Sequence, residues 1–483
     1  MTEKIQQSLR DSAGARWTAL VLLALTMFFG YIFVDVLSPL QEMLARPIAE
    51  GGRAWGPNAY GHFAGSETFL NVFVFFLIFA GVILDKMGVR FTAILSGCVM
   101  VFGGALKWYA VSDAFIGSGA EHFIDGILNL PDTAWNITPF YKGMPASAKL
   151  ASIGFMLFGC GVEMGGITVS RGIVKWFKGK ELALAMGTEM AIARLGVAVV
   201  MVGSPFIAKM SGAISISRPV AFSVLLMVIG LFCFIVYCFM DKKLEKEGVV
   251  DEGDPEDEFK FSDLGKIISS KVFWLVALLC VLYYSAIFPF QKYAINMLQC
   301  NLGYTAERAG LVFFVFPLGA AAITPLLGNF LDRKGKGASM LILGAILMII
   351  CHLTFAFALP ATKGTMAAPI IAYAGIILLG ISFSLVPATL WPSVPKLVDE
   401  KLLGSAYAVI FWIQNIGLYA FPMIIGAALA ATNKGITDPT QYDYLVPMLI
   451  FASLGGLALL FGIALKIEDK RKGYGLEEPN IEK

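Results

Sequence analysis

The chain has 483 residues, of which 57% are hydrophobic and 15% are charged, and its formal net charge is +2. A soluble domain carries about 25% charged residues, so this composition excludes an ordinary soluble protein and indicates one that crosses a membrane many times. A net charge so near zero gives no indication of a nucleic-acid partner, and none is expected.

Apolar runs separated by charged or Gly/Pro-rich breaks predict twelve membrane-spanning helices, because ~20 apolar residues suffice to cross a bilayer. In chain order the expected spans 1 to 12 are 17–43, 63–85, 89–111, 148–175, 181–208, 217–240, 272–298, 304–331, 337–360, 367–396, 402–431 and 443–466. An even number of spans places both ends of the chain on the same side of the membrane.

The basic residues of the loops indicate which side this is, since cytoplasmic loops carry an excess of Lys and Arg. They follow spans 2, 4, 8, 10 and 12: Lys86, Arg90, Lys175, Lys178, Lys180, Arg333, Lys334, Lys336, Lys396, Lys401, Lys470, Arg471 and Lys472. Both termini are therefore expected in the cytoplasm. The expected order is an N-terminus (1–16), a first bundle (17–240), a linker (241–271), a second bundle (272–466) and a tail (467–483).

The two halves repeat each other. GVILDKMGVR at 81–90 and GNFLDRKGKG at 328–337 share the pattern G-x-x-x-D-[KR]-x-G at an offset of 247 residues. Later matches, such as IARLG ending at Gly196 and IQNIG ending at Gly417, are offset by 221 residues. The polar segment 112–147 accounts for the difference as an insertion in the first half, which makes the internal repeat consistent.

The repeated loop suggests a latch on the cytoplasmic side. Asp85 and Asp332, followed by Arg90 and Arg333, lie at the ends of spans 2 and 8. A carboxylate there is expected to accept backbone N–H groups from the start of a neighbouring helix, and so to hold the halves together. The alternative, a generic short turn, explains one copy but not two at equivalent places.

At this point the chain resembles the major facilitator superfamily, over about residues 17–466. The resemblance rests on the duplicated loop, the twelve spans, the central linker and WFKGKELALAMG at 176–187. It implies an all-α membrane protein of two pseudo-symmetric six-helix bundles. Between them lies a cavity, lined by spans 1, 4, 7 and 10, that opens alternately to each side.

Charges inside the spans are the main candidates for function. An ionisable group there costs about 2.5–3.5 kcal/mol unless it faces a cavity or a partner. The candidates are Asp35, Glu163, Arg171, Glu189, Arg194 and Lys292. Glu163 and Arg194 each lie about 15 residues from the turn between spans 4 and 5, which at ~1.5 Å per residue places them at one depth.

Glu189 and Arg194 are five residues apart, or about 140° around a helix, so they are expected on different faces. Glu189 lies nearer the cytoplasm, at the depth of Arg171, and these two are expected to form a structural or gating pair. Two interpretations remain open for Glu163 and Arg194. They form a salt bridge that joins two helices, or they present opposite charges to a substrate, and both hold if the substrate breaks the pair.

Asp35 in span 1 and Lys292 in span 7 lie toward the outer half of the membrane. They are expected to pair when the outer side is closed, or to contact substrate; the alternative for Lys292 is snorkelling to the outer headgroups. Trp391, in a span with three prolines, is a candidate for the cavity lining or for a gate, and interfacial anchoring is the alternative.

Gln414 and Asn415 are the repeat equivalents of Ala193 and Arg194, so the second half carries neutral hydrogen-bonding groups where the first carries a charge. They are candidates for substrate contact. A fixed carboxylate and a fixed guanidinium at one depth suit a zwitterion, because Arg binds a carboxylate through two parallel hydrogen bonds.

A closer resemblance is to the lysosomal dipeptide transporter branch of the superfamily and its bacterial relatives. It rests on the stretches GVEMGG, AMGTEMAIARLG, FPFQK (288–292), LWPSV (390–394) and GSAYAVIFWIQNIGL (404–418). The resemblance implies that Glu163 and Arg194 contact the dipeptide termini, with Asp35, Lys292 and Trp391 nearby, and that transport is facilitated diffusion. Arg171 and the insertion depart from it.

The sequence therefore predicts a secondary transporter for dipeptides or similar zwitterions, expected as a monomer in the inner membrane of a cell with the lipid bilayer around it. The alternatives are an organic-anion exchanger that uses Arg194 and Lys292, a proton-coupled symporter, and a non-transporting sensor of the same fold. No nucleophile–base constellation or metal-ligand spacing is present, so no enzyme activity, cofactor or metal is expected.

Overall fold

The computed structural model describes residues 9–133, 136–247, 262, 264–399 and 402–479, and apart from one isolated bridge between Leu130 and Tyr141 its regular elements are helices. The α-helices are α1 (Ala13–Asp35), α2 (Gln41–Ala45), α3 (Pro57–Gly65), α4 (Phe69–Phe73), α5 (Phe76–Ala110), α6 (Gly119–Ile127), α7 (Ala146–Phe177), α8 (Leu182–Lys209), α9 (Ser217–Lys246), α10 (Leu264–Ser269), α11 (Lys271–Leu302), α12 (Ala306–Lys334), α13 (Gly337–Leu353), α14 (Leu359–Ala361), α15 (Ala367–Leu397), α16 (Leu403–Thr432) and α17 (Leu445–Lys472). Short 3₁₀ or π turns lie at Leu9–Asp11, Ser38–Leu40, Ile48–Glu50, Ser66–Thr68, Thr354–Ala358 and Pro439–Gln441.

The long helices begin and end where local sequence satisfies their free backbone groups. α11 starts behind Ser270, whose hydroxyl accepts a hydrogen bond from the backbone N–H of Phe273 at 3.4 Å. It ends at Gly303, which adopts a left-handed conformation with φ +64° that favours glycine. α15 remains one helix from Ala367 to Leu397 although it contains three prolines, each of which removes a backbone N–H donor.

Eleven helices of the described residues are long and apolar enough to cross a membrane, where the sequence predicts twelve spans. The difference lies in α5, which contains the non-helical residue Gly88 with φ +78°. Asp85, just before Gly88, pairs with Arg171 near the end of α7. Arg53 and Val111, on either side of the segment 57–110, are hydrogen-bonded to each other at 2.9 Å. This segment therefore runs out to Gly88 and returns, although it is assigned only one long helix.

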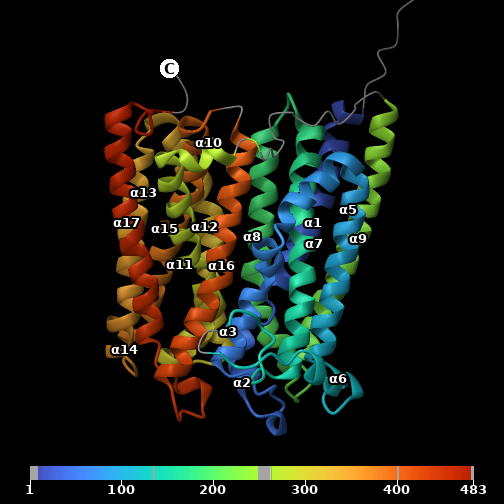
Figure 1. Ribbon diagram of the computed structural model, residues 1–483, viewed down its shortest axis with the longest axis vertical. Helices are drawn as coiled ribbons and strands as arrows, with labels where there is room; N and C mark the ends of the chain where they lie inside the picture. Colours follow the sequence, from blue (N-terminus) through green and yellow to red (C-terminus); the bar gives the residue numbers. More distant parts are fainter. Residues whose placement is uncertain (1–8, 134–135, 248–261, 263, 400–401, 480–483) are drawn as a thin grey trace, which may run out of the picture.

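The two ends of the described chain lie at the same end of the molecule, which we call the chain-end face (top of Figure 1). α7 ends at this face, since Lys180 just beyond it pairs with Asp11 at 2.7 Å. α7 begins at the opposite face, where Ser147 accepts a hydrogen bond from Trp55 at 2.9 Å. Helices α1 to α9 fill one side of the molecule and α10 to α17 the other (Figure 1). The linker expected at 241–271 begins inside α9 and includes α10, and its middle lies outside the described residues.

The two halves pack tightly at the opposite face. A Cβ added to Gly61 of α3 would lie 2.6 Å from the carbonyl oxygen of Pro422 in α16, and one added to Gly65 would meet the carbonyl oxygen of Tyr419. The Tyr60 hydroxyl also donates to the carbonyl oxygen of Lys292 at 2.8 Å. Glycine is therefore needed at both positions for α3 and α16 to approach this closely, and the seam between the halves is closed here.

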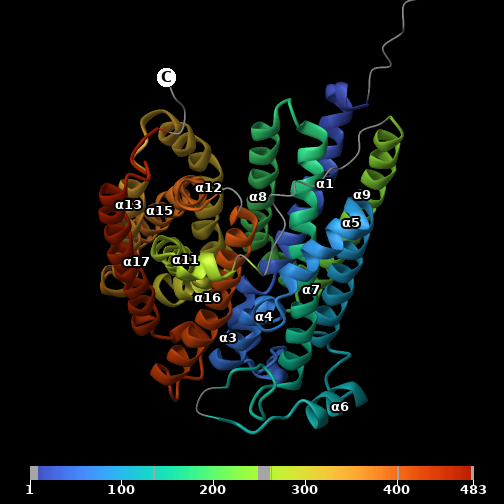
Figure 2. The same cartoon turned by 45° about the horizontal axis from the view of Figure 1, so that its top comes forward.

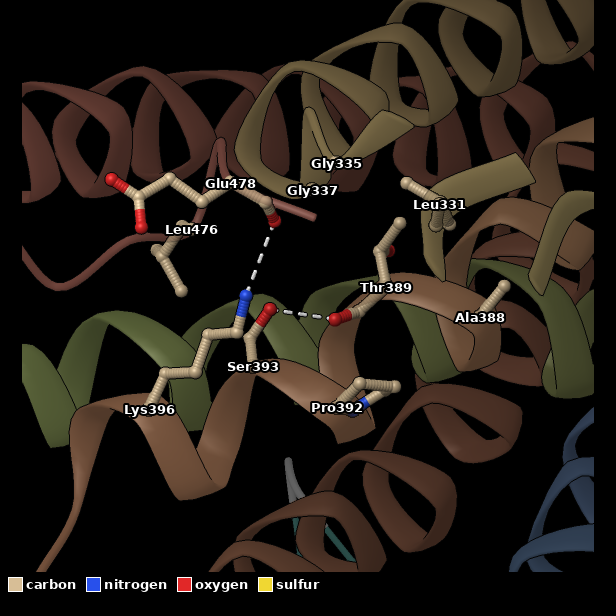
Figure 3. A pocket seen from close by; sticks show the side chains of 10 residues that line it. All are labelled: Leu331, Gly335, Gly337, Ala388, Thr389, Pro392, Ser393, Lys396, Leu476 and Glu478. Carbon is tan, nitrogen blue, oxygen red and sulfur yellow. Dashed lines mark hydrogen bonds between the residues drawn. The ribbon is translucent and has the colours of Figure 1, made fainter. Parts of the chain in front are cut away.

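At the chain-end face the described contacts tie each half to itself. Leu9 N donates to Glu247 at 2.7 Å within the first half. In the second half the tail returns to the helices: Gly337 N donates to Leu476 O at 2.9 Å, and Lys396 Nζ donates to Glu478 O at 3.3 Å (Figure 3). The ribbons of the two halves diverge toward this face (Figure 2). The named contacts at the opposite face thus join the two halves, whereas those named at the chain-end face lie within one half.

Candidate functional site

Arg194 of α8 reaches from the first half to the second. Its Nη1 donates a hydrogen bond to Thr324 Oγ1 of α12 at 3.0 Å, and its guanidinium lies 4.9 Å from the ring centroid of Phe383 in α15. The Thr324 hydroxyl donates its own proton to Ala320 O at 2.7 Å, so it acts as an acceptor toward Arg194. The guanidinium keeps further N–H donors that no described residue occupies, and it can bind an anion with them.

Three carboxylates share this neighbourhood. The charges of Glu189, Glu163, Arg194 and Glu67 all act electrostatically on the hydroxyl of Tyr31 in α1. Glu163 and Arg194 come from α7 and α8, and both side chains are half-buried. These charges therefore lie within electrostatic range of one tyrosine of α1.

No ion pair joins Glu163 to Arg194 among the residues that the structure describes, and the Glu163 carboxylate has no hydrogen-bond donor there. Arg194 instead binds the neutral Thr324. Of the two interpretations left open by the sequence, the salt bridge between helices is absent in this conformation. Arg194 is therefore available to a negatively charged group of a ligand, and Glu163 is available to a positively charged group.

The expected pair of Arg171 with Glu189 is not formed in this conformation. Arg171 Nη1 lies 2.5 Å from Asp85 Oδ1 of α5, and Glu189 acts on Tyr31 of α1. The reason is packing: α7 turns this part of its surface toward α5, whereas α8 packs along α1. Glu189 thus acts on a residue of α1 in place of Arg171 of α7.

The repeated loops also bind differently from the expected latch. Asp85 accepts a side-chain hydrogen bond from Arg171, and Arg90 pairs with Glu245 Oε2 at 2.6 Å and with Asp241 Oδ2 at 4.0 Å. Arg171, Glu245 and Asp241 belong to the same half as Asp85 and Arg90. In the second copy Asp332 is half-buried and Arg333 is exposed, and the following loop carries the tail (Figure 3).

Asp35 and Lys292 form an ion pair between α1 and α11, as one of the expectations had it. Lys292 Nζ lies 3.0 Å from Asp35 Oδ1 and 3.7 Å from Glu67 Oε2. Gln291 Nε2 also donates to Asp35 at 2.5 Å. Only 1% of Asp35 and 8% of Lys292 are exposed, so Lys292 does not extend to the headgroups.

Trp391 donates its indole N–H to the Tyr284 hydroxyl at 3.0 Å and stacks on Phe411, with ring centroids 4.9 Å apart. Arg194 acts electrostatically on the same Tyr284, so Trp391 lies one residue removed from the central charges. Gln414 and Asn415 are buried elsewhere. The Gln414 side chain accepts a hydrogen bond from Cys280 at 3.3 Å, and the backbone of Asn415 accepts one from Thr68 at 3.4 Å.

Sequence reasoning missed two buried charges. Glu67 lies beside Lys292, and Lys107 is completely buried, with Nζ 4.1 Å and 4.3 Å from the ring centroids of Phe155 and Phe33. Both lie inside the apolar runs assigned to spans 2 and 3, so the rule for charges in spans would have found them. Among the described residues, no cluster of three or more His, Cys, Asp or Glu side chains is arranged to hold a metal ion.

The sequence matches the family pattern described as Major Facilitator Superfamily over residues 20–422 and 291–479. The chain is 31% identical over 337 residues to a Danio rerio protein named lysosomal dipeptide transporter MFSD1, covering 68% of each. The Homo sapiens protein of the same name is 28% identical over 334 residues, which cover 68% of this chain and 67% of that protein.

Two solved structures share the fold. The nucleoside transporter NupG has a TM-score of 0.63 at 12% identity, covering 93% of this chain and 99% of that one. A D-xylose–proton symporter has a TM-score of 0.64 at 14% identity, covering 93% and 97%. At these identities the likeness concerns the arrangement of helices.

Proposed function

The chain belongs to the Major Facilitator Superfamily of transporters, and we propose that it carries dipeptides or similar zwitterions across a membrane by alternating access, as a uniporter. The observation that carries this proposal is that Arg194 of α8 is oriented by Thr324 and Phe383 of the other half, while the half-buried Glu163 acts on the same Tyr31 and forms no ion pair with it. The two relatives named as dipeptide transporters support the same substrate class.

The chemistry of each end of a dipeptide fits one of these charges. The free N–H donors of Arg194 bind the substrate carboxylate in a bidentate contact, while Thr324 and Phe383 hold the guanidinium from the other side. Glu163 accepts hydrogen bonds from the substrate ammonium. Because Thr324 belongs to the second half, the bound substrate would contact elements of both halves and follow their relative movement.

Alternating access would require the closed seam at the opposite face to open. There, Lys292 of the second half binds Asp35 and Glu67 of the first, and Tyr60 donates to the Lys292 backbone. We propose that this network is the outer gate. Contacts between the halves at the chain-end side would form only when that side closes, and they would involve Asp85, Arg90, Asp332 and Arg333. The side chains of Arg171 and Glu189 would rearrange at the same time.

We further propose twelve membrane crossings, with 57–87 as one and 89–110 as the next, and with both termini in the cytoplasm. The bundles would be 17–240 and 272–466. The location we propose is the inner membrane of a cell, whereas the curated relatives are named as lysosomal. We propose that the protein works as a monomer in the bilayer. The site would be supported from the second half by Gln414, Asn415 and Trp391.

Proton-coupled symport is the second candidate, because the Glu163 carboxylate has no cationic partner among the described residues and such a group can take up a proton. The organic-anion exchanger is less favoured, since Lys292, its second cation, is already bound by Asp35 and Glu67. Dipeptide uptake into substrate-free proteoliposomes with and without a pH gradient separates uniport from symport: a uniporter equilibrates substrate in both cases, and a symporter accumulates it only with the gradient.

Uptake of a radiolabelled dipeptide into proteoliposomes tests the proposal. We expect Arg194→Ala and Glu163→Gln each to reduce uptake by ~10-fold or more, since each removes a charge-assisted contact. The exposed residues Arg308 and Glu50 supply matched controls, Arg308→Ala and Glu50→Gln, which should behave as wild type. Unchanged uptake in both site variants would refute the proposed function.

A further inference from the structure

His62 of α3 is 4% exposed and lies between two backbone carbonyl groups near the opposite face. Its Nδ1 is 2.8 Å from Asn58 O, one helical turn earlier, and its Nε2 is 2.8 Å from Asn136 O in the insertion 112–147. The ring also packs against Tyr141, with centroids 4.9 Å apart. Both ring nitrogens therefore face acceptors that have no proton to offer.

This geometry suits only one protonation state. A neutral imidazole has a single N–H, so it can donate to one carbonyl and must turn a lone pair toward the other. The imidazolium has an N–H on each nitrogen and donates to both. The bond from His62 to Asn136 is therefore strongest in the charged form, and histidine changes charge between about pH 5 and pH 8.

The same loop is held from the other half of the molecule. Ile137 O, the carbonyl next to that of Asn136, accepts a hydrogen bond from the hydroxyl of Tyr419 in α16. Two consecutive carbonyl groups of the insertion are thus bound by one side chain from each half. Just beneath them Gly65 of α3 lies against the Tyr419 backbone. Parting α3 from α16 must break at least one of these two hydrogen bonds.

The other titratable groups of this region do not replace His62. They are Asp132, Asp125 and Tyr141 of the insertion, Lys149 of α7, Tyr419 of α16, and Tyr60, Tyr293 and Lys292 of the seam. Asp132 accepts from Gly143 N at 3.2 Å, and Asp125 pairs with Lys149 at 3.0 Å. Burial, together with the Asp132 charge, raises the pKa of Tyr141 to about 12, so this phenol stays neutral between about pH 5 and pH 8.

We propose that His62, Asn136, Ile137 and Tyr419 form a strap that closes the outer side and that protonation of His62 tightens. Acid on this side then favours the conformation seen in this structure, and neutral pH loosens the insertion. The inference rests on the alternating-access part of the proposed function but not on the substrate, so its test needs no dipeptide.

Hydrogen–deuterium exchange of the purified full-length protein measures the strap directly. The protein is labelled at about pH 5.5 and at about pH 7.5, with labelling times scaled for the intrinsic exchange rate. In the wild type, the amides at 136–143 should be about five-fold better protected at the lower pH. His62→Gln should bring this ratio to about one, because glutamine does not titrate. His122 of α6 is an exposed histidine in the same insertion, and His122→Gln should keep the wild-type ratio.

A pH ratio in His62→Gln equal to that of the wild type would overturn the proposal, as would better protection at the higher pH in the wild type. Tyr419→Phe, which leaves His62 in place, gives a second test if His62→Gln folds poorly. It should loosen 136–143 at both pH values while the pH ratio persists, and unaltered protection would contradict the strap. Loss of dipeptide uptake leaves these results unaffected, so the two proposals fail separately.

Discussion

Arg194 contacts the second half of the molecule through a hydrogen bond to Thr324. Its partner, Thr324, is neutral and lies 130 residues further along the chain. The Thr324 proton is already donated to Ala320, which leaves an oxygen lone pair directed at the guanidinium. Thr324 therefore fixes the orientation in which Arg194 meets a carboxylate.

Replacing Thr324 by valine keeps its shape and removes the acceptor. We expect Thr324→Val to raise KM for a dipeptide about ten-fold, because a hydrogen bond to a charged group is worth ~1.5–3 kcal/mol, and to affect kcat less. Thr324→Ser, which retains the hydroxyl, should restore most of the affinity. Concentration-dependent uptake in proteoliposomes measures both, and a serine variant as weak as the valine variant would argue against the orienting role.

The candidate residues were predictable to the extent that charge alone marks them. Glu163 and Arg194 stood out because each is a full charge within an apolar run, and counting from the hairpin turn put them at one depth. Tyr31 and Thr324 carry no charge, so nothing in their local sequence distinguishes them from ordinary span residues. Their roles come from contacts between distant helices, which no periodicity encodes.

At the scale of elements, the seam between α3 and α16 holds the two halves together at the opposite face, which we propose to be the outer side. Gly61 and Gly65 lie against the α16 backbone, and no Cβ fits at either position. This close approach allows Tyr60 to reach the Lys292 carbonyl and Trp412 Nε1 to donate to Val72 O at 3.0 Å. A side chain larger than hydrogen should therefore push the halves apart on this side.

Gly65→Ala should shift the equilibrium toward an outer-open form. Spin labels at Lys142 and Lys434, two exposed loop residues of the first and second half, would report this in a background without the seven native cysteines. We expect the label-to-label distance to lengthen and broaden in Gly65→Ala. Gly203→Ala is the control, since nothing lies within 4 Å of a Cβ there. Identical distance distributions in all three proteins would contradict the account of the seam.

The elements themselves were largely predictable, because long apolar runs leave few alternatives to membrane helices. The exception is the region of spans 2 and 3. The first of these begins at Pro57, is interrupted by a 3₁₀ turn at Ser66–Thr68, and continues through Gly88 as part of α5. Hydropathy does not report such breaks. It also does not report that Glu67, within the 3₁₀ turn, pairs with Lys292 of the opposing half.

At the scale of the whole molecule, the internal repeat predicted two halves, and the structure places α1 to α9 and α10 to α17 on two sides (Figure 1). The sequence could not indicate which side of the membrane is closed, because both conformations use the same chain. The ion pair of Lys292 with Asp35 and the position of Arg194 on Thr324 belong to this one conformation.

The proposed topology has a direct test in cysteine labelling of intact cells. Lys142→Cys in the insertion should react with a membrane-impermeant maleimide from outside. Lys178→Cys, in the turn between α7 and α8, should react only after the cells are made permeable. Both residues are exposed, so differences in labelling report sidedness. The reverse pattern would place the termini outside.

The central claim is that Glu163 and Arg194 bind the two ends of a zwitterionic dipeptide, and binding of end-blocked dipeptides tests it most directly. Isothermal titration of the purified wild type should show that N-acetylation or C-amidation of dialanine weakens binding about ten-fold or more. N-acetylation should cost nothing further in Glu163→Gln, and amidation nothing further in Arg194→Ala, because each variant has already lost the partner. Wild-type protein that binds the blocked and the free dipeptides equally well would contradict the account.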